Sequence, residues 1–110
     1  MSKTIEHVQS MAEMRKMQQK IAKEKFDEIS DLCMTKPIEC RMEETTIHLK
    51  TDAGAWKFDA AQEKVHLFHK NYKFRQSTMG NYHRQWVKAV SMRELIEYIC
   101  SHDHIKKFIW

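Results

Sequence analysis

The stretch from Lys3 to Met34 contains neither glycine nor proline, and this limits the possible folds more than any other feature of the chain. Its residues are mostly good helix formers. Apolar side chains recur along it at steps of three and four residues, the spacing of one helical face. These positions are Ile5, Val8, Met11, Ala12, Met14, Met17, Ile21, Ala22, Phe26, Ile29, Leu32 and Cys33. Because the residue before a proline avoids the α region, the sequence Thr35-Lys36-Pro37 predicts the end of this helix.

A helix of about 30 residues is about 45 Å long, which exceeds the width of a core that 110 residues can build. Part of it should therefore overhang the core or pack on another chain, unless the helix breaks near Gln18-Gln19. Met11, Met14 and Met17 follow each other at steps of three residues. Either they complete the core, or they form an adaptable interface helix for a homodimer or another partner.

After Pro37 the apolar period changes from that of a helix to that of strands. Residues 45–51, 56–59, 65–69 and 82–89 predict four strands, and 38–42 could add a short one. The sequence Ser91-Met92-Arg93-Glu94 fits a capping box that starts a last helix. The predicted fold is one α+β domain over residues 1–110: a long N-terminal helix (1–35), a four-stranded antiparallel meander (38–90), and a short C-terminal helix with a tail (91–110).

Charge is distributed unevenly along the chain. Residues 1–63 carry ten Lys and Arg against twelve Asp and Glu, a net charge of −2, whereas residues 64–110 carry nine against three, a net charge of +6. This asymmetry predicts an anionic macromolecular partner for the second part: a nucleoprotein, an acidic protein surface or a nucleic acid. The alternative is a basic face that only keeps the protein in solution.

The segment 68–75 alternates aromatic with basic side chains. Aromatic rings can stack on exposed bases while Lys and Arg neutralise phosphates. Alternatively, Tyr72 and Phe74 cover the edge of the core. The predicted partner-binding residues, which include a further arginine and two histidines, are Lys70, Tyr72, Lys73, Phe74, Arg75, Arg84, His66 and His83.

No catalytic or cofactor motif is present: the chain has no glycine-rich phosphate loop, no HExxH and no GxSxG. We therefore expect neither enzymatic activity nor a cofactor. Cys100, His102 and His104 come closest to a chelating cluster, but structural zinc sites usually have two close ligand pairs, so no metal is predicted. A small His- or metal-dependent nuclease that uses His66, His83 and Arg84 is the enzymatic alternative.

No apolar run reaches the ~20 residues of a membrane span, and the N-terminus lacks the apolar region of a signal peptide. Three widely spaced cysteines do not predict a disulfide framework, so we expect a cytoplasmic protein without membrane contact.

The function predicted from these features is non-enzymatic docking on a nucleic-acid-handling protein or nucleoprotein through a basic and aromatic surface. The overall type resembles the small single-domain proteins of phages and mobile elements, many of which bind and block a host nucleoprotein. This likeness implies an inhibitor of a host defence complex, similar to anti-CRISPR proteins. A direct nucleic-acid-binding accessory protein is the alternative binding function.

Overall fold

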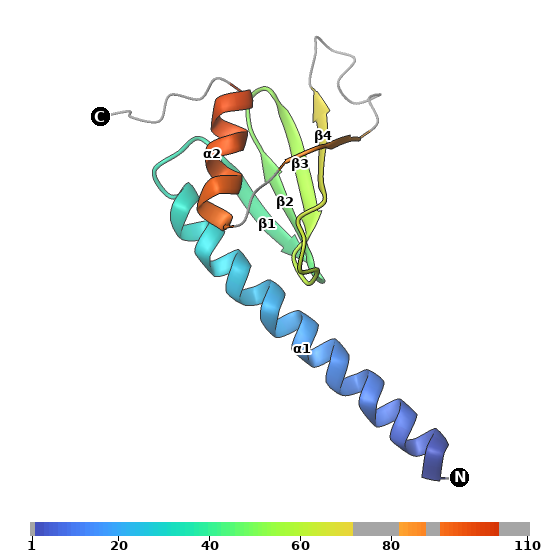
Figure 1. Ribbon diagram of the computed structural model, residues 1–110. Helices are drawn as coiled ribbons and strands as arrows, with labels where there is room; N and C mark the ends of the chain where they lie inside the picture. Colours follow the sequence, from blue (N-terminus) through green and yellow to red (C-terminus); the bar gives the residue numbers. More distant parts are fainter. Residues whose placement is uncertain (1, 72–81, 88–90, 104–110) are drawn as a thin grey trace.

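The computed structural model describes residues 2–71, 82–87 and 91–103, and it has the predicted α+β architecture (Figure 1). Two helices pack on one face of an antiparallel sheet whose strands follow each other in chain order, from β1 to β5. The sheet has five strands rather than the predicted four, because the optional strand before residue 45 forms. The elements are α1 (Ser2–Cys33), β1 (Glu39–Glu43), β2 (Thr46–Lys50), β3 (Gly54–Asp59), β4 (Leu67–Asn71), β5 (His83–Gln85) and α2 (Met92–His102).

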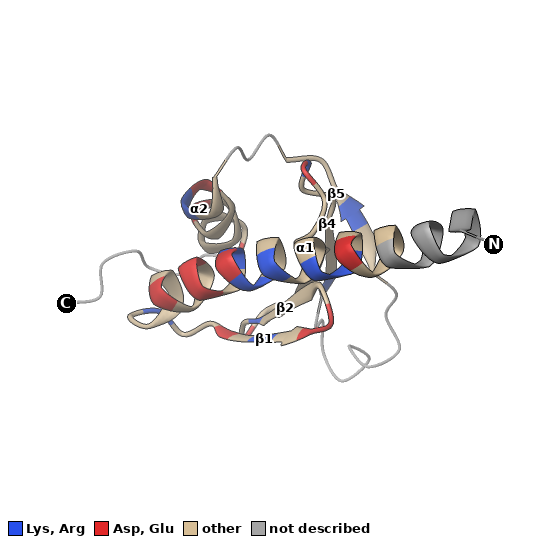
Figure 2. Ribbon diagram, turned by 90° about the horizontal axis from the view of Figure 1, so that it is seen from below, with Lys and Arg blue, Asp and Glu red and all other residues tan. Residues whose placement is uncertain are grey.

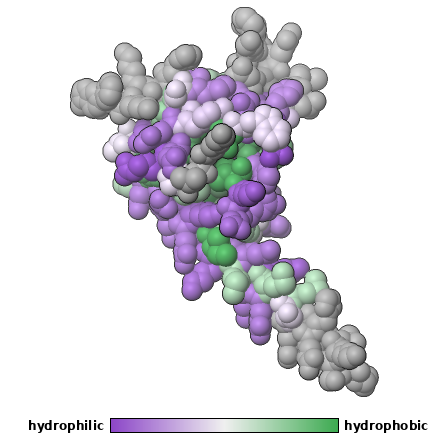
Figure 3. Space-filling view, in the orientation of Figure 1, coloured by the Kyte–Doolittle hydropathy of each residue, from purple (hydrophilic) through white to green (hydrophobic). Residues whose placement is uncertain are grey.

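Helix α1 is continuous, without a break at Gln18-Gln19, and its N-terminal half projects away from the sheet (Figure 1). The molecule therefore measures 58 Å in its longest dimension but only 33 Å and 22 Å in the others. On the projecting half, the exposed fractions of Met11, Met14 and Met17 are 52%, 58% and 65%. Figure 3 shows hydrophobic residues, in green, along this part of the surface. The interpretation that these methionines complete the core is thus wrong.

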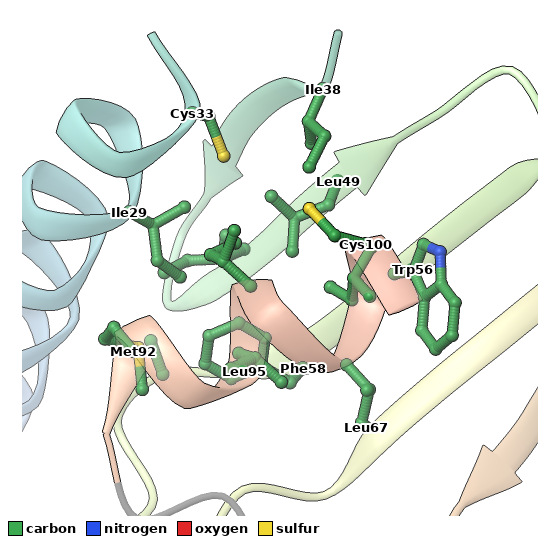
Figure 4. Packing of buried hydrophobic residues seen from close by; sticks show 14 of the residues in the cluster. Ile29, Cys33, Ile38, Leu49, Trp56, Phe58, Leu67, Met92, Leu95 and Cys100 are labelled. Carbon is green, nitrogen blue, oxygen red and sulfur yellow. The ribbon is translucent and has the colours of Figure 1, made fainter. Parts of the chain in front are cut away.

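The core fills the space between the two helices and one face of the sheet (Figure 4). Because strand side chains alternate, every second residue of β2, β3 and β4 points into it. Helix α2 contributes one continuous apolar face to the same core. The largest fully buried side chains are Trp56, Phe58, Ile29, Ile47, Leu49, Leu67, Leu95, Ile96, Ile99 and Cys100.

The start of α2 confirms the first half of the predicted capping box. The Ser91 side chain accepts a hydrogen bond from the backbone N–H of Glu94 at 3.1 Å. The Glu94 carboxylate does not reach the backbone of Ser91 but accepts from its hydroxyl, also at 3.1 Å. This N-cap fixes where α2 begins, and so where its last turn meets the sheet.

Two strand boundaries differ from the prediction. Lys70 lies in β4 rather than in a loop, since β4 continues to Asn71. Strand β5 covers only His83–Gln85 instead of 82–89. Beyond it, Val87 packs against the core, whereas Trp86 is 80% exposed.

Candidate functional site

The face of the sheet opposite the core is not covered by either helix among the described residues. Strand register aligns a row of outward side chains across all five strands, because residues paired in antiparallel strands point to the same side. From β1 to β5 this row is Arg41, His48, Lys57, Phe68 and Arg84. Four spacings of about 4.8 Å make it about 19 Å wide, enough to lie along several nucleotides of one strand.

A second row beside the first adds two lysines and, in β1, the carboxylate of Glu39, which pairs with Lys50. Lys50 and Lys70 flank Ala55 in the register of β2, β3 and β4. Tyr82 lies over this region, with the Lys57 and Lys70 ammonium groups 4.2 Å and 5.3 Å from the centre of its ring. We call the two rows together the basic sheet face; it comprises Arg41, His48, Lys50, Lys57, Phe68, Lys70, Tyr82 and Arg84.

Cations and aromatic rings are also paired at the β5 edge of this face. The Arg84 guanidinium lies 4.2 Å from the centre of the Trp86 ring. Arg84 also contacts the His66 ring, so both predicted residues belong to the same surface. A planar guanidinium stacked on an exposed indole presents both a phosphate-binding group and an aromatic surface for a base.

A hollow of about 440 Å³ lies at one end of the basic sheet face. Phe68 lines it together with the imidazole of His48 and the ammonium group of Lys57. Its remaining walls include the carboxylates of Glu43, Glu44 and Asp59. An aromatic ring beside both donors and acceptors suits a flat, polar group such as a nucleobase.

His48 has a lowered pKa, so its ring is largely neutral at physiological pH. Burial is the main cause, followed by the positive charge of Arg41; the carboxylate of Glu43 acts in the opposite direction, and Lys57 adds a smaller lowering effect. An anion placed on this face would favour the protonated ring.

The structure places only part of the sequence-predicted site on this face. Lys70, Arg84 and His66 lie there, whereas His83 pairs with His69 across β4 and β5 and so belongs to the opposite face. His66, His83 and Arg84 therefore do not converge on one catalytic centre. Four further predicted residues, Tyr72, Lys73, Phe74 and Arg75, lie outside the described residues.

Sequence reasoning missed the part of the site that β1, β2 and β3 contribute. The alternation of residues 45–51 and 56–59 puts His48, Lys50 and Lys57 on the polar side of their strands. Only the register shows that they continue the row from Arg84 and Phe68.

A second group of polar side chains lies on the core side of the sheet, where β4 meets the end of α2. His69, His102 and Asp103 offer nitrogen and oxygen atoms that all lie within 4.8 Å of one another. The Asp103 carboxylate is 1% exposed, and the His69 side chain is 5% exposed. The His69 ring stacks on Trp56 with 4.0 Å between ring centres, and it meets the His102 ring edge-on at 4.6 Å.

The two oxygens of Asp103 have different surroundings. Its Oδ2 accepts hydrogen bonds from the Thr51 hydroxyl at 2.7 Å and from Trp56 Nε1 at 2.9 Å. Its Oδ1 lies 2.9 Å from His102 Nδ1 and 4.0 Å from His69 Nε2. Burial would raise the pKa of Asp103, but the hydrogen bonds from Thr51, His102 and Trp56 outweigh it and lower the pKa.

His69 is a neutral imidazole at physiological pH, because its pKa is lowered first by burial and then by the charge of His102; Asp103 opposes this shift. Its Nε2 atom is buried and makes no hydrogen bond within the described ranges 2–71, 82–87 and 91–103. The sequence had pointed to Cys100, His102 and His104 in this region. Of these, Cys100 is buried in the core and His104 lies outside the described residues.

Comparison of the chain with protein-family models, curated proteins and solved structures found no match. Among the described residues, neither helix combines the length and the apolar character that crossing a lipid bilayer requires. The function therefore has to be argued from the two sites alone.

Proposed function

We propose that this protein is a non-enzymatic binding protein whose basic sheet face holds a single-stranded nucleic acid. The observation that carries this proposal is the row of Arg41, His48, Lys57, Phe68 and Arg84 across the face of the sheet that neither described helix covers. Cations on such a row neutralise phosphates regardless of sequence. These cations would bind any anionic surface. A second feature of the face is therefore needed to distinguish a nucleic acid from other anionic partners.

That second feature is the aromatic component of the face. Phe68 is half-buried within the row, Tyr82 lies against two lysines, and Trp86 is 80% exposed under Arg84. Base stacking on such rings contributes about 1–3 kcal/mol per base and requires unpaired bases, which a duplex does not offer. An acidic protein surface would use the cations but not the ring faces. The combination therefore favours a single strand.

A single strand held within a nucleoprotein offers the same phosphates and bases as a free one. Docking on such a complex, as an inhibitor of a nucleic-acid-handling machine, is therefore the biological form that we propose. We propose the cytoplasm as its location, since such partners and the widely spaced cysteines both fit a reducing compartment.

The test is fluorescence anisotropy with labelled single-stranded RNA, single-stranded DNA and duplex DNA, each over a series of salt concentrations. With three to five phosphates contacted, the logarithm of affinity for a single strand should fall with the logarithm of salt at a slope of about −2 to −3.5. Both single strands should bind more tightly than the duplex. Absence of binding at low salt would refute the proposal and leave a protein partner, to be sought by affinity capture.

The matched variants are two triple charge reversals. Lys57→Glu, Lys70→Glu and Arg84→Glu remove three contacts worth about 1 kcal/mol each, so affinity should fall at least ~100-fold. The control changes Arg15, Lys16 and Lys20 of α1 to Glu. The N-terminal half of α1 projects away from the sheet (Figure 1), and the middle turns of the helix are rich in Lys and Arg (Figure 2). This control alters net charge equally but should leave the salt slope unchanged. Equal losses of affinity in the two triple variants would show that binding depends on net charge alone.

We further propose that the projecting half of α1 pairs with the same helix of a second copy. Met11, Met14, Met17 and Ile21 form an exposed apolar stripe there, and water-exposed stripes of this kind are normally buried against another surface. Sedimentation velocity should show a dimer for the native chain and a monomer for Met14→Glu. Arg15→Glu, one residue further along, should remain dimeric. A native chain that is monomeric at high concentration would rule out this pairing.

A further inference from the structure

We infer that His69, His102 and Asp103 bind one divalent transition-metal ion, for which Zn²⁺ is the best match. Two imidazole nitrogens and one carboxylate oxygen form a ligand set that Zn²⁺ and neighbouring metals accept in proteins. This site lies on the core side of the sheet and is independent of the basic sheet face.

The first observation that points to a ligand is the orphaned nitrogen of His69. Its Nε2 atom is buried, makes no hydrogen bond with any residue that the structure describes, and faces Asp103 Oδ1 across 4.0 Å. This distance is too long for a hydrogen bond. A buried polar atom without a partner is destabilising, so a native structure usually satisfies it with a protein group, a water molecule or an ion.

The second observation is the spacing of the candidate ligand atoms. At metal–ligand bonds of about 2.1 Å, neighbouring ligand atoms lie about 3.0 Å apart around an octahedral ion and about 3.4 Å apart around a tetrahedral one. Asp103 Oδ1 lies 2.9 Å from His102 Nδ1 and 4.0 Å from His69 Nε2. An ion between these atoms needs to draw Asp103 Oδ1 and His69 Nε2 together by about 0.6–1 Å. The most distant pair of the three ligand atoms, which lies within 4.8 Å, has to shorten by at most about 1.8 Å. The ion would replace the proton that His102 and Asp103 now share.

The third observation is that Asp103 is oriented for this role by its neighbours. Its Oδ2 is occupied by the Thr51 hydroxyl and Trp56 Nε1, which leaves Oδ1 directed at the two histidines. Hydrogen bonds that hold a ligating carboxylate in this way are a regular feature of protein metal sites. The His102 side chain is 34% exposed, so the ion can enter from that side and water can complete its coordination.

The experiment titrates the full chain, without a histidine tag and freed of metal by chelator, with Zn²⁺ by calorimetry and with Co²⁺ by visible absorption. We expect one ion per chain, Co²⁺ ligand-field bands that Zn²⁺ abolishes, and a rise in the unfolding temperature with Zn²⁺. His102→Ala and His69→Phe should each weaken binding at least ~100-fold, since removal of a ligand exceeds the effect of removing its supporting hydrogen bond. The matched control, His66→Ala, removes a histidine from the other face and should bind normally.

X-ray absorption of the Zn²⁺-loaded native chain makes the test independent of how the variants fold. It should show two imidazoles bound to the metal. No stoichiometric binding by the native chain, fewer than two imidazoles in the spectrum, or native affinity in His69→Phe would each overturn the inference.

Discussion

Replacing Thr51 by valine should destabilise the protein far more than a surface threonine substitution, because Thr51 joins the β2–β3 turn to the end of α2. The hydroxyl donates to Asp103 at 2.7 Å, and it accepts from the backbone N–H groups of Ala53 at 3.1 Å and Gly54 at 3.2 Å. Thr51 is 4% exposed, so water can replace the lost partners only in part. Valine keeps the shape of the side chain and removes only these hydrogen bonds.

The magnitude follows from the three bonds. A hydrogen bond to a buried charged group contributes about 1.5–3 kcal/mol, and each backbone donor that loses its acceptor adds about 0.5–1 kcal/mol where water partly replaces it. We expect Thr51→Val to lower the free energy of unfolding by about 2.5–5 kcal/mol, a large part of the 5–15 kcal/mol typical of a domain. Urea unfolding followed by far-UV circular dichroism measures this loss at unchanged m-value.

The same substitution should also change the pH dependence of stability. Because the folded-state pKa of Asp103 is lowered, its carboxylate contributes stability above the unfolded value of about 3.9 and loses it as pH falls through the folded value. Without the Thr51 hydrogen bond this contribution becomes smaller. The difference in free energy of unfolding between the native chain and Thr51→Val should therefore be largest near neutral pH and decrease in acid.

The control for this prediction is Thr46→Val on the outer face of β2. Thr46 is half-buried, and its hydroxyl makes no hydrogen bond with the described residues, so little stability should be lost. Two results would contradict the hydrogen bond between Thr51 and Asp103. One is that Thr51→Val lowers the free energy of unfolding no more than Thr46→Val does; the other is that it lowers it equally at all pH values.

Three further predictions test separate parts of the structure. The pKa of His48 is lowered and an anion favours its protonated ring, so affinity for a single strand should rise as pH falls through the range in which this ring is protonated. His48→Gln should reduce this rise, and equal pH profiles for both proteins would contradict it. Glu44 adopts a left-handed backbone with φ of 57°, which costs a non-glycine residue about 1–2 kcal/mol, so Glu44→Gly should gain about 0.5–1 kcal/mol after its own entropy cost; a lower urea midpoint would refute the strain. His69→Phe in metal-free protein should cost less than about 1 kcal/mol, because it removes a buried nitrogen without a partner and keeps the ring on Trp56; a loss above about 2 kcal/mol would indicate a bond that we have not identified.

Much of the fold could be predicted from local sequence patterns. The helical spacing before residue 34 and the Ser91 cap depend on neighbours within four residues, which the sequence displays directly. The short strand β1 is hard to predict because Glu43-Glu44 interrupts the alternation of apolar and polar residues. In the structure Glu44 forms the tight turn of a hairpin in which Glu43 pairs with Thr46. A charged pair that disfavours a continuous strand is thus compatible with two strands joined by a turn.

The candidate sites were harder to predict because they depend on distant pairings. The row from Arg41 to Arg84 requires four independent strand registers, and a slip of one residue in any of them would move its side chains to the core face. Asp103 and Thr51 are 52 residues apart, and they meet only because α2 ends over the β2–β3 turn. No spacing rule within the sequence connects them.

His69 is the residue at which the alternating pattern and the chemistry disagree most clearly. Its position in β4 points into the core beside Leu67 and opposite Trp56, where an apolar side chain would pack without any unmet polar group. Sequences are usually consistent between local pattern and packing, and exceptions concentrate at functional sites. The His69 ring packs on Trp56, and its Nε2 atom has no hydrogen-bond partner among the described residues. This nitrogen is therefore free to bind a ligand. Since Asp103 and His102 direct their own atoms to the same point, the three residues are better explained by a shared ligand than by the needs of the core.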